Sequence, residues 1–93
     1  MRFLYKPRYL KAFERAGVSL QKLILHTDKE IKDYLETGKA RYGLRITKLG
    51  KRSFEGRVSE GVRIVWVREG DLISFVMVGD HREVQNYLRN YNQ

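Results

Sequence analysis

Cysteine is absent from this 93-residue chain, and histidine occurs only twice. Without cysteine, the protein can form neither a disulfide nor a thiolate metal site. The two histidines, His26 and His81, stand far apart in the sequence and give no zinc-ligand pattern. We therefore expect no metal site and no other cofactor.

Long apolar runs are also missing. The longest mainly apolar stretch, residues 72–78, falls far short of the roughly 20 residues that span a bilayer. The opening residues, Met1 to Lys6, contain no apolar signal region followed by a small-residue cleavage site. A chain of this length can build one two-layer core. We therefore predict a single cytoplasmic domain over residues 1–93, with no membrane association.

Acidic residues are outnumbered. The chain has 19 Lys and Arg against 11 Asp and Glu, a formal net charge of +8. The excess is concentrated between Arg41 and Arg68, a segment in which Glu55 and Glu60 are the only acidic residues. Such a segment indicates a polyanionic partner, either nucleic acid or an acidic protein. The alternative is a cationic surface that faces only solvent.

The first part of the chain has the pattern of a short strand and a helical hairpin. Residues 3–5 predict a strand, and Pro7 suits the first position of a helix that ends at Gly17. Ser19 is the expected N-cap of a second helix, whose apolar residues recur at the i, i+3, i+4 spacing until Gly38. One apolar face of this hairpin should cover the core.

After Gly38 the apolar period changes from helical to two, which is typical of strands. Asp80 and Glu83 then form a capping-box pair at the start of a last helix. The sequence thus predicts an α+β fold of order β-α-α-β-β-β-β-α. In it, a small antiparallel sheet carries the helical hairpin on one face, and a short C-terminal helix closes the end. The four later strands are expected at residues 43–48, 54–58, 62–67 and 72–78.

Charged side chains gather on the outward face of this predicted sheet. Glu55 and Arg57 share a face because they are two residues apart on one strand. A tight turn then brings Arg63 of the next strand near Arg57. Two guanidinium groups on a rigid sheet can bind a phosphate in a bidentate manner. An ion pair of Glu55 with Arg57 or Arg63 is the structural alternative.

His81 lies at the junction between the last strand and the last helix. Backbone N–H groups at a helix start attract anions, and imidazole suits proton transfer near neutral pH. A histidine at such a junction is also commonly a surface or capping residue. His26 lies within the second helix, and we interpret it as structural.

Several short motifs follow one another between residues 43 and 84, and in order and spacing they resemble the RelE/ParE toxin superfamily of toxin–antitoxin systems. With the helical hairpin before them, the similarity extends to nearly the whole chain. The motifs are Gly43-Leu44-Arg45 with Lys48-Leu49, Phe54-Glu55-Gly56-Arg57-Val58, Gly61-Val62-Arg63-Ile64-Val65-Trp66 and Val78-Gly79-Asp80-His81-Arg82-Glu83-Val84.

The resemblance implies two classes of activity. The RelE-like branch cuts mRNA, commonly on the ribosome, and an antitoxin protein restrains it. The ParE-like branch binds DNA gyrase and cuts no RNA. We favour a metal-independent mRNA endoribonuclease with a cognate antitoxin. The alternatives are a ParE-type gyrase inhibitor and a non-toxic relative that binds only RNA or a protein.

The resemblance also implies residue roles. Arg63 would contact the scissile phosphate with Arg57 beside it, His81 would be the general acid, and Tyr87 would stack on a base. Glu55 stands where some members have a lysine, so the general base stays open between Glu55 and a lysine such as Lys48. Further RNA contacts are expected from the basic residues Arg45, Lys48, Lys51, Arg52 and Arg82.

Overall fold

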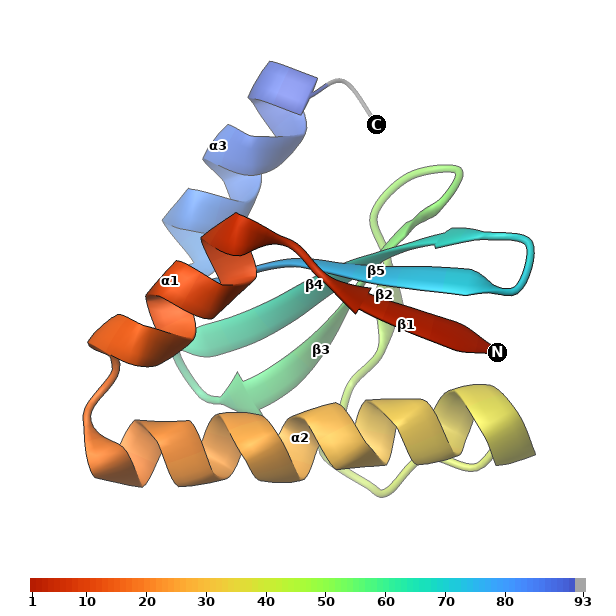
Figure 1. Cartoon of the computed structure of the whole chain (residues 1–93), viewed down its shortest axis with the longest axis horizontal. Coiled ribbons are helices and arrows are strands. Elements are labelled where there is room, and N and C mark those ends of the chain that lie inside the picture. Colours follow the sequence, from red (N-terminus) through yellow and green to blue (C-terminus); the bar gives the residue numbers. More distant parts are fainter. Residues whose placement is uncertain (92–93) are drawn as a thin grey trace.

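A five-stranded sheet with helices on both faces forms the centre of the computed structural model, which describes residues 1–91 (Figure 1). The elements follow the predicted order of one strand, two helices, four strands and a last helix, and the α+β class is confirmed. In chain order they are β1 (Arg2–Tyr5), α1 (Pro7–Arg15), α2 (Val18–Thr37), β2 (Thr47–Lys48), β3 (Ser53–Ser59), β4 (Val62–Glu69), β5 (Leu72–Gly79) and α3 (His81–Tyr91).

One face of the sheet packs against α1 and α2. Side chains alternate across a strand, so Ile64 and Trp66 of β4 point into this layer, where they join the buried Ile24 and Ile31 of α2. β5 lies between β1 and β4 and is buried from Ile73 to its end. This confirms the prediction that a strand apolar on both faces lies in the sheet interior.

The opposite face carries α3 and a smaller core. Val65 of β4 and Met77 of β5 point to this side and pack with Val84 and Tyr87 of α3. The predicted capping box is present, because the Glu83 N–H donates to Asp80 Oδ1 at 2.8 Å and the Asp80 N–H donates to Glu83 Oε1 at 2.9 Å. The capping box therefore fixes where α3 begins, directly above the end of β5.

The sheet is mixed, whereas the sequence predicted antiparallel pairing. β2 to β5 form the expected antiparallel meander. β1 joins its far edge in parallel with β5, with Arg2 opposite Leu72 and Tyr5 opposite Phe75. Residue periodicity reports which face a side chain takes and carries no information about strand direction, so this pairing was missed.

Two local predictions were wrong. Gly17, not Ser19, is the N-cap of α2, and no side chain caps that end. The strand expected from residue 43 is reduced to Thr47 and Lys48. Gly43 and Arg45 have φ of 99° and 48°, in the left-handed region, which breaks the extended geometry that strand pairing needs. Gly38 does end α2 with a φ of 78°, as predicted.

A partly buried polar cluster lies where β1 meets the helical layer. The Tyr5 hydroxyl donates to Asp28 Oδ2 at 2.5 Å, and the Lys32 ammonium lies 3.6 Å from Asp28 Oδ1. Burial first, and then Asp28, raises the pKa of Tyr5 and also that of Tyr9. Both phenols therefore keep their protons at neutral pH, and the cluster serves to tie β1 to α2.

Within residues 1–91, no helix has the length and apolar character needed to cross a bilayer.

Candidate functional site

Strand register places the two predicted site arginines, Arg57 and Arg63, in one row across the sheet. Arg57 of β3 lies opposite Arg63 of β4, and Arg63 lies opposite Gly79 of β5. Neighbouring Cα atoms in such a row are about 5 Å apart. His81 begins α3 two residues after Gly79. The side chains of this row point to the same face of the sheet as Val65 and Met77. Because α3 packs on that face, it begins at the Gly79 end of the row.

Arg63 is held in place from two sides. Its Nε lies 3.4 Å from Glu55 Oε2, with the two side chains only 17% and 14% exposed. Its Nη1 donates to the carbonyl oxygen of Glu60 at 3.2 Å and to that of Ser59 at 3.4 Å. The ion pair considered as the structural alternative therefore exists. It also fixes the orientation of the guanidinium, which is what a phosphate site requires.

The guanidinium of Arg57, unlike that of Arg63, has a buried donor without a partner in the described part of the chain. Its Nε is buried and has no hydrogen-bond acceptor among the described residues. A buried donor without a partner costs about 1–3 kcal/mol, so a fold keeps one only for a reason. The backbone of Arg57 is well fixed, because its N–H donates to the Leu44 carbonyl at 2.7 Å. The Nε of Arg57 is thus a donor for which the described residues supply no acceptor.

The side chain of His81 is exposed and makes no hydrogen bond or ion pair with any residue in the described part of the chain. Asp80, not His81, caps α3. The imidazole is therefore available for chemistry. Gly79 lets α3 start this close to β5, because a Cβ there would lie 2.9 Å from Met77 Cε and 3.0 Å from Glu83 Cβ. The position of His81 thus depends on a glycine that the sequence motif also contains.

The two candidates for the general base lie on different faces. Glu55 lies opposite Val65 and shares the face of Arg63. Lys48 lies opposite Phe54, whose ring stacks on Trp66 in the layer with α1 and α2. Opposite residues of an antiparallel pair point to the same side. The register therefore brings Glu55, and not Lys48, to the arginines.

The remaining predicted RNA contacts are spread around the meander. Lys51 and Arg52 lie exposed between β2 and β3, and Arg52 pairs with Glu69 at 3.2 Å. Arg45 is exposed just before β2, and Arg82 is exposed beside His81. Lys51 and Arg52 lie at the end of the meander away from the row, because the neighbouring Ser53 lies opposite Val67 whereas Arg57 lies opposite Arg63.

Tyr87 is only 8% exposed, and its ring belongs to the small core under α3. The Arg8 guanidinium covers it at 5.6 Å from the ring centroid. A ring placed in this way has little face left for a base, so stacking by Tyr87 stays a prediction that would need α3 to shift.

Sequence reasoning missed two features. Tyr42 is 97% exposed and stands two residues before Leu44, the residue that accepts the Arg57 N–H. Three basic residues, Arg8, Lys11 and Arg15, fall on one side of α1 at helical spacing. The sequence spacing could have revealed this basic face, but only the apolar face of the same helix was used to predict its packing.

Among residues 1–91, no three His, Asp or Glu side chains form a cluster that could hold a metal ion.

Comparisons with known proteins identify the fold. No family model and no curated protein matches the sequence. Among solved structures, a copper-bound mutant toxin from Helicobacter pylori is 18% identical with a TM-score of 0.67, and 90% of this chain covers 98% of that one. The YoeB dimer from Staphylococcus aureus is 13% identical with a TM-score of 0.68, covering 87% and 97% of the two chains.

A third structure, a RelB–RelE antitoxin–toxin complex from Methanococcus jannaschii, matches at 19% identity and a TM-score of 0.64, over 90% of this chain and 96% of the matched one. The chain therefore has the fold of the RelE/ParE toxins. The resemblance drawn from the sequence motifs is confirmed at the level of the fold.

Proposed function

We propose that this protein is the toxin of a toxin–antitoxin system and that it cuts mRNA without a metal, on the ribosome. The observation that carries the proposal is the row formed by Arg57, Arg63 and the start of α3. The row contains two cations: Arg63, whose guanidinium is held in place, and Arg57, whose Nε has no acceptor among the described residues. The imidazole of His81 is available beside them. Cleavage of RNA needs cations to stabilise the phosphate and an acid to protonate the leaving oxygen. The toxin fold supports the same conclusion.

The chemistry is an internal transesterification. The 2′ oxygen of one nucleotide bonds to the adjacent phosphorus, and the bond from phosphorus to the 5′ oxygen breaks. Arg57 and Arg63 stabilise the charge that builds on the phosphorane. His81 gives a proton to the leaving 5′ oxygen, and Glu55 takes the 2′ proton. The products are a 2′,3′-cyclic phosphate and a free 5′-hydroxyl.

A protein antitoxin is part of the proposal. The structurally similar RelE was solved in complex with its antitoxin RelB. The net charge of +8 on this chain favours a partner with acidic surfaces.

Mapping of RNA ends tests the proposed function. Expression of the chain should produce 2′,3′-cyclic and 5′-hydroxyl ends in translated mRNA, and the Arg63→Ala, His81→Ala double variant should produce none. Lys22→Ala, at an exposed position on α2, is the matched control and should cut like the parent. Purified protein with naked mRNA, compared with translating ribosomes, shows whether the ribosome is required.

Unchanged cleavage by the double variant would remove this site from the mechanism. DNA breaks with intact mRNA would instead indicate gyrase inhibition. RNA binding without cleavage or toxicity would indicate a relative that only binds.

A further inference from the structure

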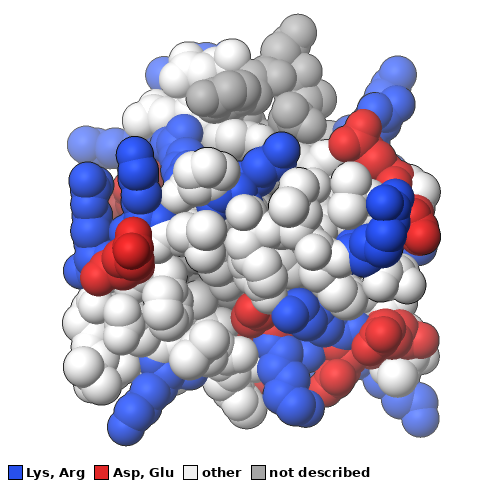
Figure 2. Space-filling model, viewed as in Figure 1, with Lys and Arg blue, Asp and Glu red and all other residues white. Residues whose placement is uncertain are grey.

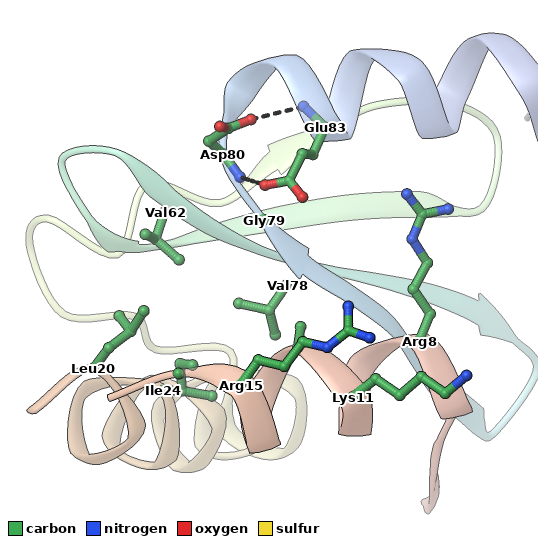
Figure 3. Close-up of a pocket in the computed structure, with 12 residues that line it drawn as sticks. Arg8, Lys11, Arg15, Leu20, Ile24, Val62, Val78, Gly79, Asp80 and Glu83 are labelled. Atoms are coloured by element: carbon green, nitrogen blue, oxygen red, sulfur yellow. Dashed lines mark hydrogen bonds between the residues drawn. The ribbon is translucent and has the colours of Figure 1, made fainter. Parts of the chain in front are cut away.

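Basic side chains alone do not mark a binding site on this protein, because Figure 2 shows Lys and Arg on several sides of the visible face. A groove of about 740 Å³ beside α1 has such a cationic wall, along which Arg8, Lys11 and Arg15 extend (Figure 3). The residues that line this groove, however, include no buried polar side chain. A second pocket, of about 310 Å³, does include one, which is Ser74.

This second pocket, which we call the Ser74 pocket, lies on the face of the sheet that carries α3. Ser74 of β5 lies opposite Val67 of β4, and opposite residues of an antiparallel pair point to the same side. Val67 and Val76 both pack against the core under α3, which places the floor of the pocket on that face. The rim is formed by Lys6, Arg52, Glu69 and Tyr87. The pocket therefore has an aliphatic floor, with one hydroxyl in it, and a polar rim.

The hydroxyl of Ser74 is the feature that points to a ligand. Ser74 is only 6% exposed, and its side chain makes no hydrogen bond with any residue between Met1 and Tyr91. The same residue lines the pocket. A buried hydroxyl that lacks a partner is unfavourable, and folded proteins keep few of them. A hydroxyl that faces a pocket in this state is ready to bond with a molecule that enters it.

The charge at the rim comes chiefly from Lys6. The backbone of Lys6 is fixed between β1 and α1, because its N–H donates to the Phe75 carbonyl at 2.9 Å. Its side chain makes no hydrogen bond or ion pair with another described residue. Arg52, in contrast, pairs with Glu69 at 3.2 Å, and this offsets its charge. The pocket therefore offers one hydroxyl and one ammonium that no described residue engages.

We propose that the Ser74 pocket binds one nucleotide. The aliphatic side chains of Val67 and Val76 suit the flat face of a base, and the Lys6 ammonium suits its phosphate. The Ser74 hydroxyl can both donate and accept, so it can bond with the edge of any of the four bases. A pocket of this size lies at the lower end of the range for small-molecule sites, which fits a single nucleotide and not a longer segment.

The Ser74 pocket shares one face of the sheet with the proposed cleavage site. Val67 lies four residues along β4 from Arg63, a distance of about 13 Å at the usual rise of a strand. Residues an even number apart on a strand point to the same side. A nucleotide that flanks the cut can therefore occupy the pocket and set the position of the RNA on the row. This role rests on the proposed function, whereas binding of a free nucleotide does not.

NMR titrations of the full chain distinguish the two sources of the nucleotide. The probes are an uncleavable 2′-O-methyl tetranucleotide, adenosine 5′-monophosphate and uridine 5′-monophosphate. If the nucleotide belongs to RNA, the tetranucleotide should shift the amide signals of Val67 and Ser74 along the same binding curve as those of Arg57 and Arg63. If the pocket takes a free nucleotide, the monophosphates should shift Val67 and Ser74, and the tetranucleotide should leave these two signals fixed.

Two substitutions remove the groups that the pocket offers. Ser74→Ala should weaken binding about two- to tenfold, the usual effect of losing one hydrogen bond, and should leave thermal unfolding unchanged. Lys6→Ala should reduce the slope of log affinity against log salt for the tetranucleotide by about 0.7, as expected for one phosphate contact on a single strand. Lys22→Ala, the matched control on α2, should leave the affinity and the slope as in the parent.

Val67 and Ser74 signals that stay fixed with every probe, up to its limit of solubility, would overturn the proposal. Affinities and salt slopes of Ser74→Ala and Lys6→Ala equal to those of the parent would overturn it as well. Shifts of Val67 and Ser74 by a monophosphate, with Arg57 and Arg63 unmoved by the tetranucleotide, would retain the pocket and remove the RNA site. Failure of this proposal is therefore distinguishable from failure of the proposed function.

Discussion

Replacing His81 with alanine should slow RNA cleavage by about 10²–10⁴-fold, the usual contribution of a positioned general acid. The loss should fall on kcat, because the imidazole acts on the leaving 5′ oxygen and holds no ground-state contact. Stability should hardly change, since His81 is exposed and has no partner in the described chain, and Asp80 caps α3. Single-turnover cleavage of a labelled RNA measures the rate, and thermal unfolding measures the stability.

The matched control is the neighbouring exposed residue of the same helical turn. Arg82→Ala removes a cation and no proton donor, so it should weaken RNA binding and leave the single-turnover rate at saturation close to that of the parent. Imidazole added to the His81→Ala protein should restore part of the lost rate. Equal effects of both substitutions, with no recovery, would mean that His81 is only a binding residue.

Replacing Arg57 with leucine should lower cleavage by about 10²–10³-fold, the typical loss when one charge-stabilising donor is removed. The same change should leave the free energy of unfolding unchanged or raise it. Arg57 Nε is buried without an acceptor, and removing an unsatisfied buried donor relieves a cost of about 1–3 kcal/mol. Residues that are kept for function commonly lower the stability of the folded protein, and we expect Arg57 to be one of them.

Arg63→Leu provides the contrast. It should also abolish most activity, but it leaves Glu55, only 14% exposed, without its cation. Removing one partner of such a pair is destabilising, so this variant should unfold at lower denaturant concentration than the parent. Urea titrations of the two variants decide the point. Destabilisation by Arg57→Leu with full activity would show that Arg57 is a structural residue.

The sequence correctly predicted two features that depend on contacts between residues close together in the chain. The capping box joins Asp80 and Glu83, which are three residues apart, and both of its hydrogen bonds form. The tight turn between β3 and β4 correctly placed Arg63 across from Arg57, because a short hairpin fixes its own register.

Contacts between residues that are distant in the sequence could not be predicted. The parallel pairing of β1 with β5 joins segments from opposite ends of the chain. Tyr87 lies on the face of α3 that packs on the sheet, and only the tertiary contact with Arg8 shows how little of the ring remains available. The left-handed φ of Arg45 shortened β2 and was not signalled by residue type. The groove beside α1 is lined by residues of α1, α2, β4, β5 and the start of α3, so it could not be predicted at all.

Binding of an uncleavable dinucleotide, methylated at the 2′ oxygen, offers the most direct test of whether one phosphate meets all three groups. Side-chain NMR signals of Arg57, Arg63 and His81 should shift together along a single binding curve, while those of Lys22 stay fixed. A dinucleotide that shifts the arginine signals and leaves the imidazole unchanged at saturation would contradict a shared site.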